Sequence, residues 1–483
     1  MRHLYDTARP MEPRGVARGQ AVGRSWWLAP CAPFLHAMSK EPSGSIVPNQ
    51  QRALDRIEAG PSLDSDAKAS RTGAFTDNMK LPVHRWLRYS AGFSAEWVER
   101  VVRDHCPPEG LFFDPFAGSG TALLAAQAAG IQSAGAESHP FVVRIAEAKL
   151  AWQSDPALLE ARAGALVGRA NAIVAGHDVT SELLLKCYSG PALAQLETLR
   201  RAFLEEPKSD PISSLLWLAI TAILRECSGV GTAQWQYILP NKSKARVVQP
   251  FDAFAMRIAM FCSDMRNHRI TVDRPMCEAT VAADDARTLA GFSGLAGKVD
   301  LIVTSPPYPN NYDYADATRL EMTFWREIAR WSDLQNAVRH KLVRSCSQHS
   351  AAEKLDLESL LDDEAISPIR DELSTVCNAL SEARETRAGK KTYHTMVGAY
   401  FNDLALTWRA LRKLCTDDAK VCFVIGDSAP YGVHVPAERW LATLAVAEGF
   451  SSPQFEKIRD RNMKWKNRKH RVPLLEGNLW VRG

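Results

Sequence analysis

Short apolar runs recur along the chain and determine its predicted fold. Leu111-Phe112-Phe113, Leu301-Ile302-Val303 and Val421 to Ile425 are continuous apolar segments of strand length. Runs of this kind are typical of parallel strands that are buried on both faces of a sheet. Before the third run, apolar side chains recur at helical spacing and predict an amphipathic helix: Val397, Tyr400, Phe401, Leu404, Trp408, Leu411 and Leu414. The pattern predicts an α/β fold.

The first apolar run leads into a glycine-containing loop, Asp114 to Thr121 (DPFAGSGT), which opens a predicted helix. Gly118 and Gly120 allow a ligand to approach the backbone and allow positive φ. The loop does not follow the dinucleotide pattern GxGxxG, and the chain has no GxxxxGK[ST] phosphate loop. An acidic residue before the glycines suits a cationic ligand without phosphate. The alternative is an ordinary glycine turn between a strand and a helix.

Acidic residues follow later predicted strands. Ile131 to Glu137 is a second predicted strand that ends in a carboxylate, about 20 positions beyond the start of the glycine loop. A carboxylate at this distance is well placed to bind ribose hydroxyls. Asp284 and Asp285 lie in a later turn. Acidic residues are also common in surface turns.

The second apolar run leads into Thr304 to Tyr308 (TSPPY). The Ser305 hydroxyl and the Pro306 carbonyl are hydrogen-bond acceptors, and two consecutive prolines with fixed φ hold that carbonyl rigidly. Two acceptors can bind both protons of an exocyclic amine and direct its lone pair at a methyl donor. The Tyr308 ring offers a surface on which an extruded base can stack. The alternative is a proline turn at the end of a strand.

The two loops, in this order and each after a strand, resemble motifs I and IV of the amino-methyltransferases. This family transfers a methyl group from S-adenosylmethionine to an exocyclic nitrogen of a nucleobase. Residues 81–102 resemble the family's motif X, in which Phe93 and a helix capped by Ser94 are the expected elements. The resemblance implies a Rossmann-like class I methyltransferase fold, with a seven-stranded, mostly parallel sheet and helical insertions.

The resemblance also implies roles for individual residues. Ser305, Pro306, Pro307 and Tyr308 would form the catalytic loop. S-adenosylmethionine would be bound by Asp114, Pro115, Phe116, Gly118, Gly120, Thr121, Glu137, Asp285 and Thr304. Ser-Pro-Pro-Tyr is found mostly in cytosine-N4 enzymes, so we expect a site-specific DNA cytosine-N4 methyltransferase that flips its base. The alternatives are an adenine-N6 DNA methyltransferase, an RNA methyltransferase and a non-catalytic DNA-binding protein.

Charge is concentrated near the carboxyl terminus. The formal net charge of +4 is too small to identify a nucleic-acid partner, but residues 457–471 (KIRDRNMKWKNRKHR) hold eight Lys or Arg and one Asp around a tryptophan. Basic residues beside an aromatic ring suit contact with phosphates, whereas the alternative is a solvated loop. The expected DNA contacts are Lys464, Trp465, Lys466, Arg468, Lys469 and Arg471.

The remaining sequence predicts the domain organisation and the cellular compartment of the protein. The ten cysteines form no CxxC pair, so no zinc site or disulfide framework is indicated, and no apolar run is long enough to span a bilayer. A reducing cytoplasm is expected, and a cognate restriction endonuclease or defence-system proteins are candidate partners. The expected parts are a disordered extension (1–70), methyltransferase segments (71–150, 279–325 and 396–483), a helical insertion that is a candidate for target recognition (151–278) and a charged helical insertion (326–395).

Overall fold

The computed structural model describes residues 75–483, except 90–91, 175, 177–178, 208, 234–235, 272–276, 351–354, 388–390 and 462–471. The chain divides into two units, Met1–Pro61 and Ser62–Gly483. The following description concerns the second unit. The predicted disordered extension (1–70) and the predicted DNA contacts between Lys464 and Arg471 lie outside the described residues.

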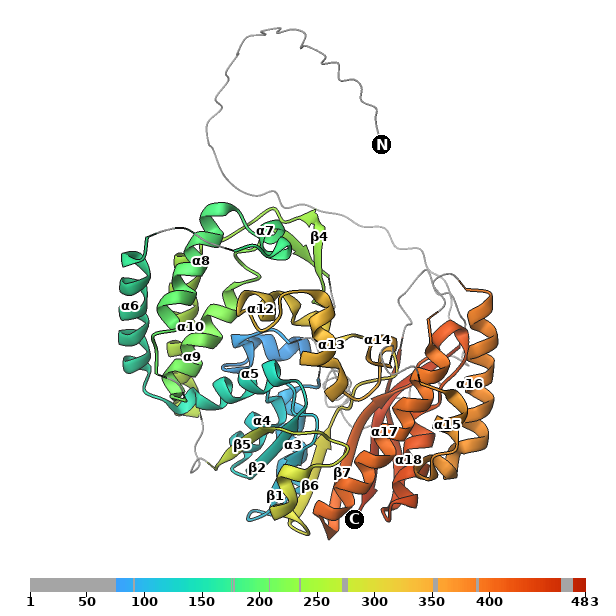
Figure 1. Cartoon of the computed structure of the whole chain (residues 1–483). Coiled ribbons are helices and arrows are strands. Elements are labelled where there is room, and N and C mark those ends of the chain that lie inside the picture. The colour runs from blue at the N-terminus through green and yellow to red at the C-terminus, as the bar shows by residue number, and fades with distance from the viewer. Residues whose placement is uncertain are drawn as a thin grey trace, which may run out of the picture. The chain divides into compact units, whose positions relative to one another are not determined.

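Seven strands form one twisted sheet in the order β5-β2-β1-β6-β7-β9-β8 (Figure 1). Strand β9 is antiparallel to both of its neighbours, and the other strands run parallel to one another. The predicted seven-stranded, mostly parallel methyltransferase sheet is therefore confirmed. The strands are β1 (Leu111–Asp114), β2 (Gln132–Glu137), β5 (Ala279–Ala283), β6 (Val299–Thr304), β7 (Cys415–Gly426), β8 (Ser451–Arg461) and β9 (Leu474–Arg482).

Successive side chains of the central strands are buried on opposite faces of the sheet, as the continuous apolar runs require. Phe112 packs in the core under α3 (Ala95–His105) and α4 (Thr121–Ala129). Its neighbour Phe113 packs in the core under α17 (Tyr393–Leu414) and α18 (Ala437–Ala447). Helices therefore cover both faces of the sheet.

The parallel strands all end at one edge of the sheet, which places their last residues together. Asp114 ends β1, Glu137 ends β2, Thr304 ends β6 and Gly426 ends β7. Open α/β sheets bind their ligands at this edge. Both loops identified in the sequence therefore open at the same edge.

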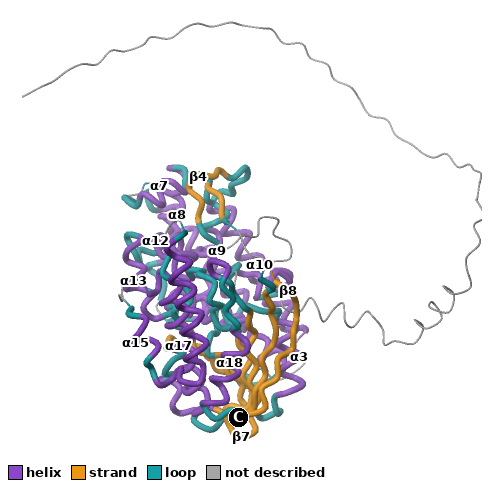
Figure 2. The backbone as a smooth tube through the Cα atoms, turned by 90° about the vertical axis from the view of Figure 1, so that its right-hand side faces the viewer, coloured by secondary structure: helices purple, strands orange, loops and turns teal. Residues whose placement is uncertain are grey.

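Residues 140–271 form a helical part, visible on one side of the sheet in Figure 1, and its apolar core also includes Trp86, Leu320 and Leu334. Trp217 of this part packs edge to face on Phe141, with 5.1 Å between ring centroids. The hairpin β3–β4 lies far from β7 in both views (Figures 1 and 2). The elements are α5 (Pro140–Leu150), α6 (Pro156–Ala172), α7 (Glu182–Cys187), α8 (Gly190–Phe203), α9 (Pro211–Ile223), β3 (Val230–Thr232), β4 (Ile238–Ser243) and α10 (Pro250–Thr271).

A second group of helices follows β6 and returns the chain to α17. Leu373, Cys377 and Leu380 of its longest helix, α16, are buried in the core that α17 shares. Among the described residues, no helix is both long and apolar enough to cross a membrane. The helices are α11 (Tyr314–Ala317), α12 (Arg319–Phe324), α13 (Leu334–Ala337), α14 (Ser347–Ser350), α15 (Leu357–Leu361) and α16 (Arg370–Glu385). The 3-10 turns are η1 (Phe75–Lys80), η2 (His84–Trp86), η3 (Ala151–Gln153), η4 (Ala290–Leu295), η5 (Trp331–Asp333), η6 (Arg339–Lys341), η7 (Glu364–Ile369) and η8 (Pro430–Gly432).

A buried carboxylate on α10 fixes the segment that precedes the sheet. Asp264 is 1% exposed and accepts hydrogen bonds from the Val83 backbone, from Arg85 Nε at 2.9 Å and from Trp86 Nε1 at 3.0 Å. The Trp86 ring also stacks on Phe261, with 4.3 Å between ring centroids. Asp264 therefore ties the segment before α3 to the helical part.

Replacing Asp264 with alanine is expected to lower the free energy of unfolding by about 3 kcal/mol, because three donors lose one buried acceptor. Urea unfolding followed by circular dichroism measures the change. Asp252→Ala, at an exposed site on the same helix, is the matched control and should alter stability by less than about 0.5 kcal/mol. Equal effects of the two substitutions would contradict the structural role of Asp264.

Candidate functional site

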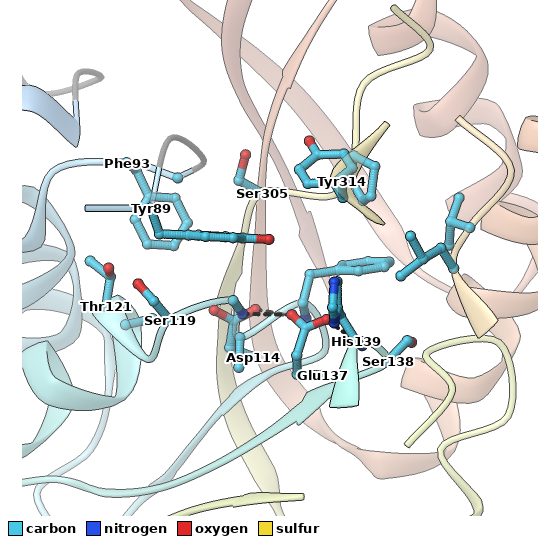
Figure 3. A pocket seen from close by; sticks show the side chains of 18 residues that line it. Tyr89, Phe93, Asp114, Ser119, Thr121, Glu137, Ser138, His139, Ser305 and Tyr314 are labelled. Carbon is cyan, nitrogen blue, oxygen red and sulfur yellow. Dashed lines mark hydrogen bonds between the residues drawn. The ribbon is translucent and has the colours of Figure 1, made fainter. Parts of the chain in front are cut away.

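A cavity of about 730 Å³ opens at the carboxyl edge of the sheet, between the two predicted loops (Figure 3). Figure 3 shows Tyr89, Ser305 and Tyr314 on one side of it, across from Asp114 and Glu137. The lining residues are Tyr89, Gly92, Phe93, Asp114, Phe116, Ala117, Gly118, Ser119, Thr121, Ala122, Glu137, Ser138, His139, Ser305, Pro307, Tyr314, Leu342 and Val343.

Asp114 joins the ends of β1 and β6. Its side chain is buried, and its Oδ1 accepts a hydrogen bond from the Thr304 hydroxyl at 2.6 Å and from the Phe116 N–H at 3.0 Å. Burial raises the pKa of Asp114 to about 7, although both hydrogen bonds act to lower it. The carboxylate thus holds the two loops together and lacks a cation to stabilise its charge.

Glu137, at the end of β2, holds the glycine loop from the other side. Its Oε2 accepts from the Gly118 N–H and its Oε1 from the His139 N–H, both at 2.8 Å. Burial raises the pKa of Glu137 to about 7. The same desolvation lowers the pKa of His139 to about 3, so the imidazole is neutral. The cavity therefore has two carboxylates, one buried (Asp114) and one half-buried (Glu137), that a cationic ligand would stabilise.

The glycine loop has the backbone that its composition predicts. Gly118 has φ of 52° and Gly120 has φ of 82°, both in the left-handed region that favours glycine. A Cβ atom on Gly118 would lie 3.5 Å from the Tyr89 ring and would fill part of the cavity. Gly120 caps the N-terminus of α4, whose first residue, Thr121, lines the cavity. The loop thus presents a bare backbone to a ligand.

Aromatic side chains from distant segments cover the cavity. Tyr89 and Phe93 come from the segment before α3, and Phe93 lies in the region predicted to be motif X. Tyr314 comes from the segment after the TSPPY loop, and Leu342 and Val343 come from the second group of helices. Burial raises the pKa values of Tyr89 and Tyr314, so both phenols stay protonated.

The TSPPY loop passes between this cavity and a second hollow. Ser305 and Pro307 line the first cavity, whereas Pro306 is buried. Tyr308 is not among the described lining residues of the first cavity, and the Arg461 guanidinium lies over its ring, 4.9 Å from the centroid. The Asn310 N–H donates to the Tyr308 carbonyl at 2.7 Å and tightens the turn.

The segment after the loop is anchored by a buried ion pair. Asp313 Oδ2 accepts from Arg339 Nη2 at 2.7 Å, and the Asp313 backbone N–H donates to the Tyr237 hydroxyl at 2.8 Å. Hydrogen bonds from His349 and Arg339 hold the pKa of Asp313 at about 2, against the effect of burial. This anchor connects the TSPPY loop to both helical parts.

The structure brings seven of the residues predicted from sequence to the cavity: Asp114, Phe116, Gly118, Thr121, Glu137, Ser305 and Pro307. Thr304 and Gly120 act through neighbouring residues: Thr304 donates a hydrogen bond to Asp114, and Gly120 is the N-cap of α4. Asp285 is not among the described lining residues, and its carboxylate is bound by Arg287, with 2.7 Å between Oδ2 and Nη2. Pro115 also lies outside the described lining.

Sequence reasoning missed several lining residues. Ser138 and His139 directly follow the predicted Glu137, and this proximity was a usable signal. Leu342 and Val343 lie 34 and 35 positions beyond Tyr308, the last residue of the TSPPY loop, and have no local signature. Only tertiary packing brings them to the cavity.

The described residues fit S-adenosylmethionine. Asp114, which is buried, and Glu137, which is half-buried, are carboxylates with raised pKa values, and the backbone of Gly118 leaves room that a side chain would fill. A sulfonium amino acid carries the positive charge that such a site lacks, and its ribose offers hydroxyl groups to a carboxylate at the end of β2.

Comparisons with known proteins give a consistent result. Residues 1–148 match the family described as DNA methylase. Type II methyltransferase M.BsoBI of Geobacillus stearothermophilus is 23% identical over 435 residues, which cover 80% of this chain and 82% of the relative. Type II methyltransferase M.AvaI of Nostoc sp. is 24% identical over 298 residues, which cover 56% and 59%.

Among solved structures, the rRNA methyltransferase aviRa from Streptomyces viridochromogenes has 14% identity and a TM-score of 0.20, covering 59% of this chain and 80% of that one. The family match and the curated relatives agree with the sheet order and with the cavity at its carboxyl edge. The family match and these relatives support an S-adenosylmethionine-dependent DNA methyltransferase of the N4/N6 family.

Proposed function

We propose that this DNA methyltransferase modifies the exocyclic N4 amine of cytosine after flipping the base out of the helix. The observation that carries the proposal is that Ser305 lines the same cavity as Asp114 and Glu137. A hydroxyl acceptor for the amine is thereby held beside the site that fits the methyl donor. The hydrogen bond between Thr304 and Asp114 fixes the position of the TSPPY loop relative to the glycine loop, because it joins the two loops.

The reaction needs the amine lone pair to point at the methyl group. S-adenosylmethionine supplies that methyl group as an electrophile. The Ser305 hydroxyl accepts a hydrogen bond from one amine proton, and the Pro306 carbonyl accepts one from the other. Because the site residues are preorganised, the amine is oriented without a base of matched pKa. The buried aromatic side chains of Tyr89 and Tyr314 limit the access of water.

Cytosine is favoured over adenine because the loop begins with serine, which is commoner in cytosine-N4 enzymes. Adenine N6 is the second candidate, since its amine would use the same two acceptors. The curated relatives are named Type II methyltransferases. We therefore propose a role in restriction-modification, with a cognate endonuclease as a candidate partner.

The basic segment that contains Lys464 to Arg471 is the proposed DNA contact. It connects β8, which ends at Arg461, to β9, which begins at Leu474. Because β8 runs parallel to β7, the chain leaves β8 at the same edge of the sheet as the TSPPY loop. Phosphate contacts made from this edge would bring the target base close to Ser305.

Ser305→Ala is expected to lower kcat for methyl transfer to DNA by about tenfold or more, since one amine acceptor is lost. Transfer of labelled methyl groups to DNA measures the rate. The dissociation constant of S-adenosylmethionine, measured by calorimetry, should change less than about twofold because the cofactor does not depend on this hydroxyl. A rate equal to that of the wild type would refute the role of Ser305.

Asp114→Asn is expected to weaken S-adenosylmethionine binding by about tenfold or more, because the cavity loses one of two negative charges that face a cation. Calorimetric titration of the purified variant tests this effect. Glu99→Gln changes a half-exposed carboxylate on α3 and serves as the matched control. Unchanged affinity of the Asp114 variant would remove the cofactor assignment.

The affinity for S-adenosylmethionine is expected to rise with pH between about 6 and 7.5. Asp114 and Glu137 have pKa values raised to about 7, so they are mostly protonated at the lower pH, whereas a cationic ligand favours their ionised forms. The dissociation constant should fall by up to about tenfold for each titrating group per pH unit below its pKa. Glu137→Gln should make this dependence shallower, and a flat wild-type profile would contradict the electrostatic account.

A further inference from the structure

Arg461 lies over the ring of Tyr308 and also lines a second hollow. Its Cζ atom lies over the ring, 4.9 Å from the centroid. The hollow has a volume of about 500 Å³ and lies beside the TSPPY loop, lined in part by Asn310, Asp427 and Ser428. Among the described residues, Arg461 lines this hollow and Tyr308 does not. The guanidinium therefore separates the ring from the space beside it.

Arg461 is held in this position by groups on two strands. Its Nη1 donates to the Asp427 carbonyl at 2.7 Å, and its Nε lies 3.4 Å from Glu476 Oε2. The side chain also packs on the backbone of Gly426, where an added Cβ would come within 2.8 Å of Nη1. The side chain of Arg461 is 18% exposed. These contacts define one position over the ring.

A planar base and a guanidinium compete for the same aromatic face. Cation–π attraction holds an arginine over a tyrosine ring, and base stacking on such a ring gives an attraction of similar size. A base that enters from the second hollow must displace Arg461 before it can stack on Tyr308. The exchange replaces one ring contact with another.

The position of Arg461 in the chain connects this exchange to the DNA contact. Arg461 is the last residue of β8, and the segment from 462 to 471 that follows it holds the basic residues proposed to contact phosphates. Phosphates bound next to Arg461 in the chain would offer its guanidinium a new partner.

We propose that Arg461 is a positioning residue that covers Tyr308 in the DNA-free enzyme and is displaced by the target base. This inference rests on the proposed function. While Arg461 covers the ring, Tyr308 cannot stack on a base, so only the uncovered fraction of the protein molecules can bind one. The affinity is therefore lowered for a base that is not part of a duplex whose phosphates the protein also binds. The cover thereby favours duplex substrates over single strands.

The test measures binding of a single-stranded oligonucleotide by fluorescence anisotropy, using a site that the wild-type protein methylates. Arg461→Ala is compared with Arg459→Ala, the matched control. Arg459 lies on the same strand and its Nη2 is 2.7 Å from the same Glu476, so its loss removes an equal charge. Relative to this control, Arg461→Ala should bind the single strand about fivefold more tightly.

A double-mutant cycle with Tyr308→Leu identifies the cause. If Arg461 acts by covering the ring, its substitution should have no effect on affinity in the Tyr308→Leu background. The proposal would be overturned if Arg461→Ala bound the single strand no more tightly than Arg459→Ala. It would also be overturned if Arg461→Ala had the same effect on affinity in the Tyr308→Leu background as in the wild type. S-adenosylmethionine binding, measured on each variant, reports whether the fold is intact.

The outcomes separate this inference from the proposed function. A wild-type protein that methylates no DNA refutes the proposed function before any variant is compared. A wild-type protein that methylates DNA, combined with no difference between Arg461→Ala and Arg459→Ala, refutes only the covering role of Arg461.

Discussion

The hydrogen bond between Thr304 and Asp114 is the contact on which the site depends. It is 2.6 Å long, buried, and joins the ends of two adjacent parallel strands. Through it, the loop that would hold the methyl donor and the loop that would hold the amine keep one relative position. Catalysis of methyl transfer requires such positioning, since two substrates must meet in line. The sheet supplies the rigid support on which both loops rest.

Two carboxylates, the buried Asp114 and the half-buried Glu137, would give this arrangement its selectivity for a cofactor. Asp114 and Glu137 accept hydrogen bonds from the loops, yet burial still raises their pKa values to about 7. Without a ligand, their ionised forms are costly. A ligand with positive charge and no phosphate relieves this cost, which favours a sulfonium cofactor over a nucleotide. The same groups that shape the glycine loop therefore select the cofactor by charge.

Local patterns predicted four strands and the loops that follow two of them, whereas the seven-stranded sheet was implied by the family resemblance. The apolar runs before Asp114 and Thr304 mark buried strands, and the turn chemistry of Gly118 and Gly120 appears in their positive φ. Long-range contacts had no such signal. The Asp313–Arg339 ion pair joins residues 26 positions apart, and Asp285, one of two equivalent acids in the sequence, is bound by Arg287. Partners of this kind are set by tertiary packing, which a single sequence does not record.

The most direct test of the account is the chemical identity of the methylated nucleoside. Purified protein would be incubated with labelled S-adenosylmethionine and unmethylated DNA, and the digested DNA analysed by mass spectrometry. The account predicts labelled N4-methylcytosine, which Ser305→Ala should strongly reduce. Labelled N6-methyladenine would agree with the role of the two acceptors of the TSPPY loop but would contradict cytosine as the target base. Absence of label from every DNA nucleoside, with the cofactor bound, would contradict the central claim.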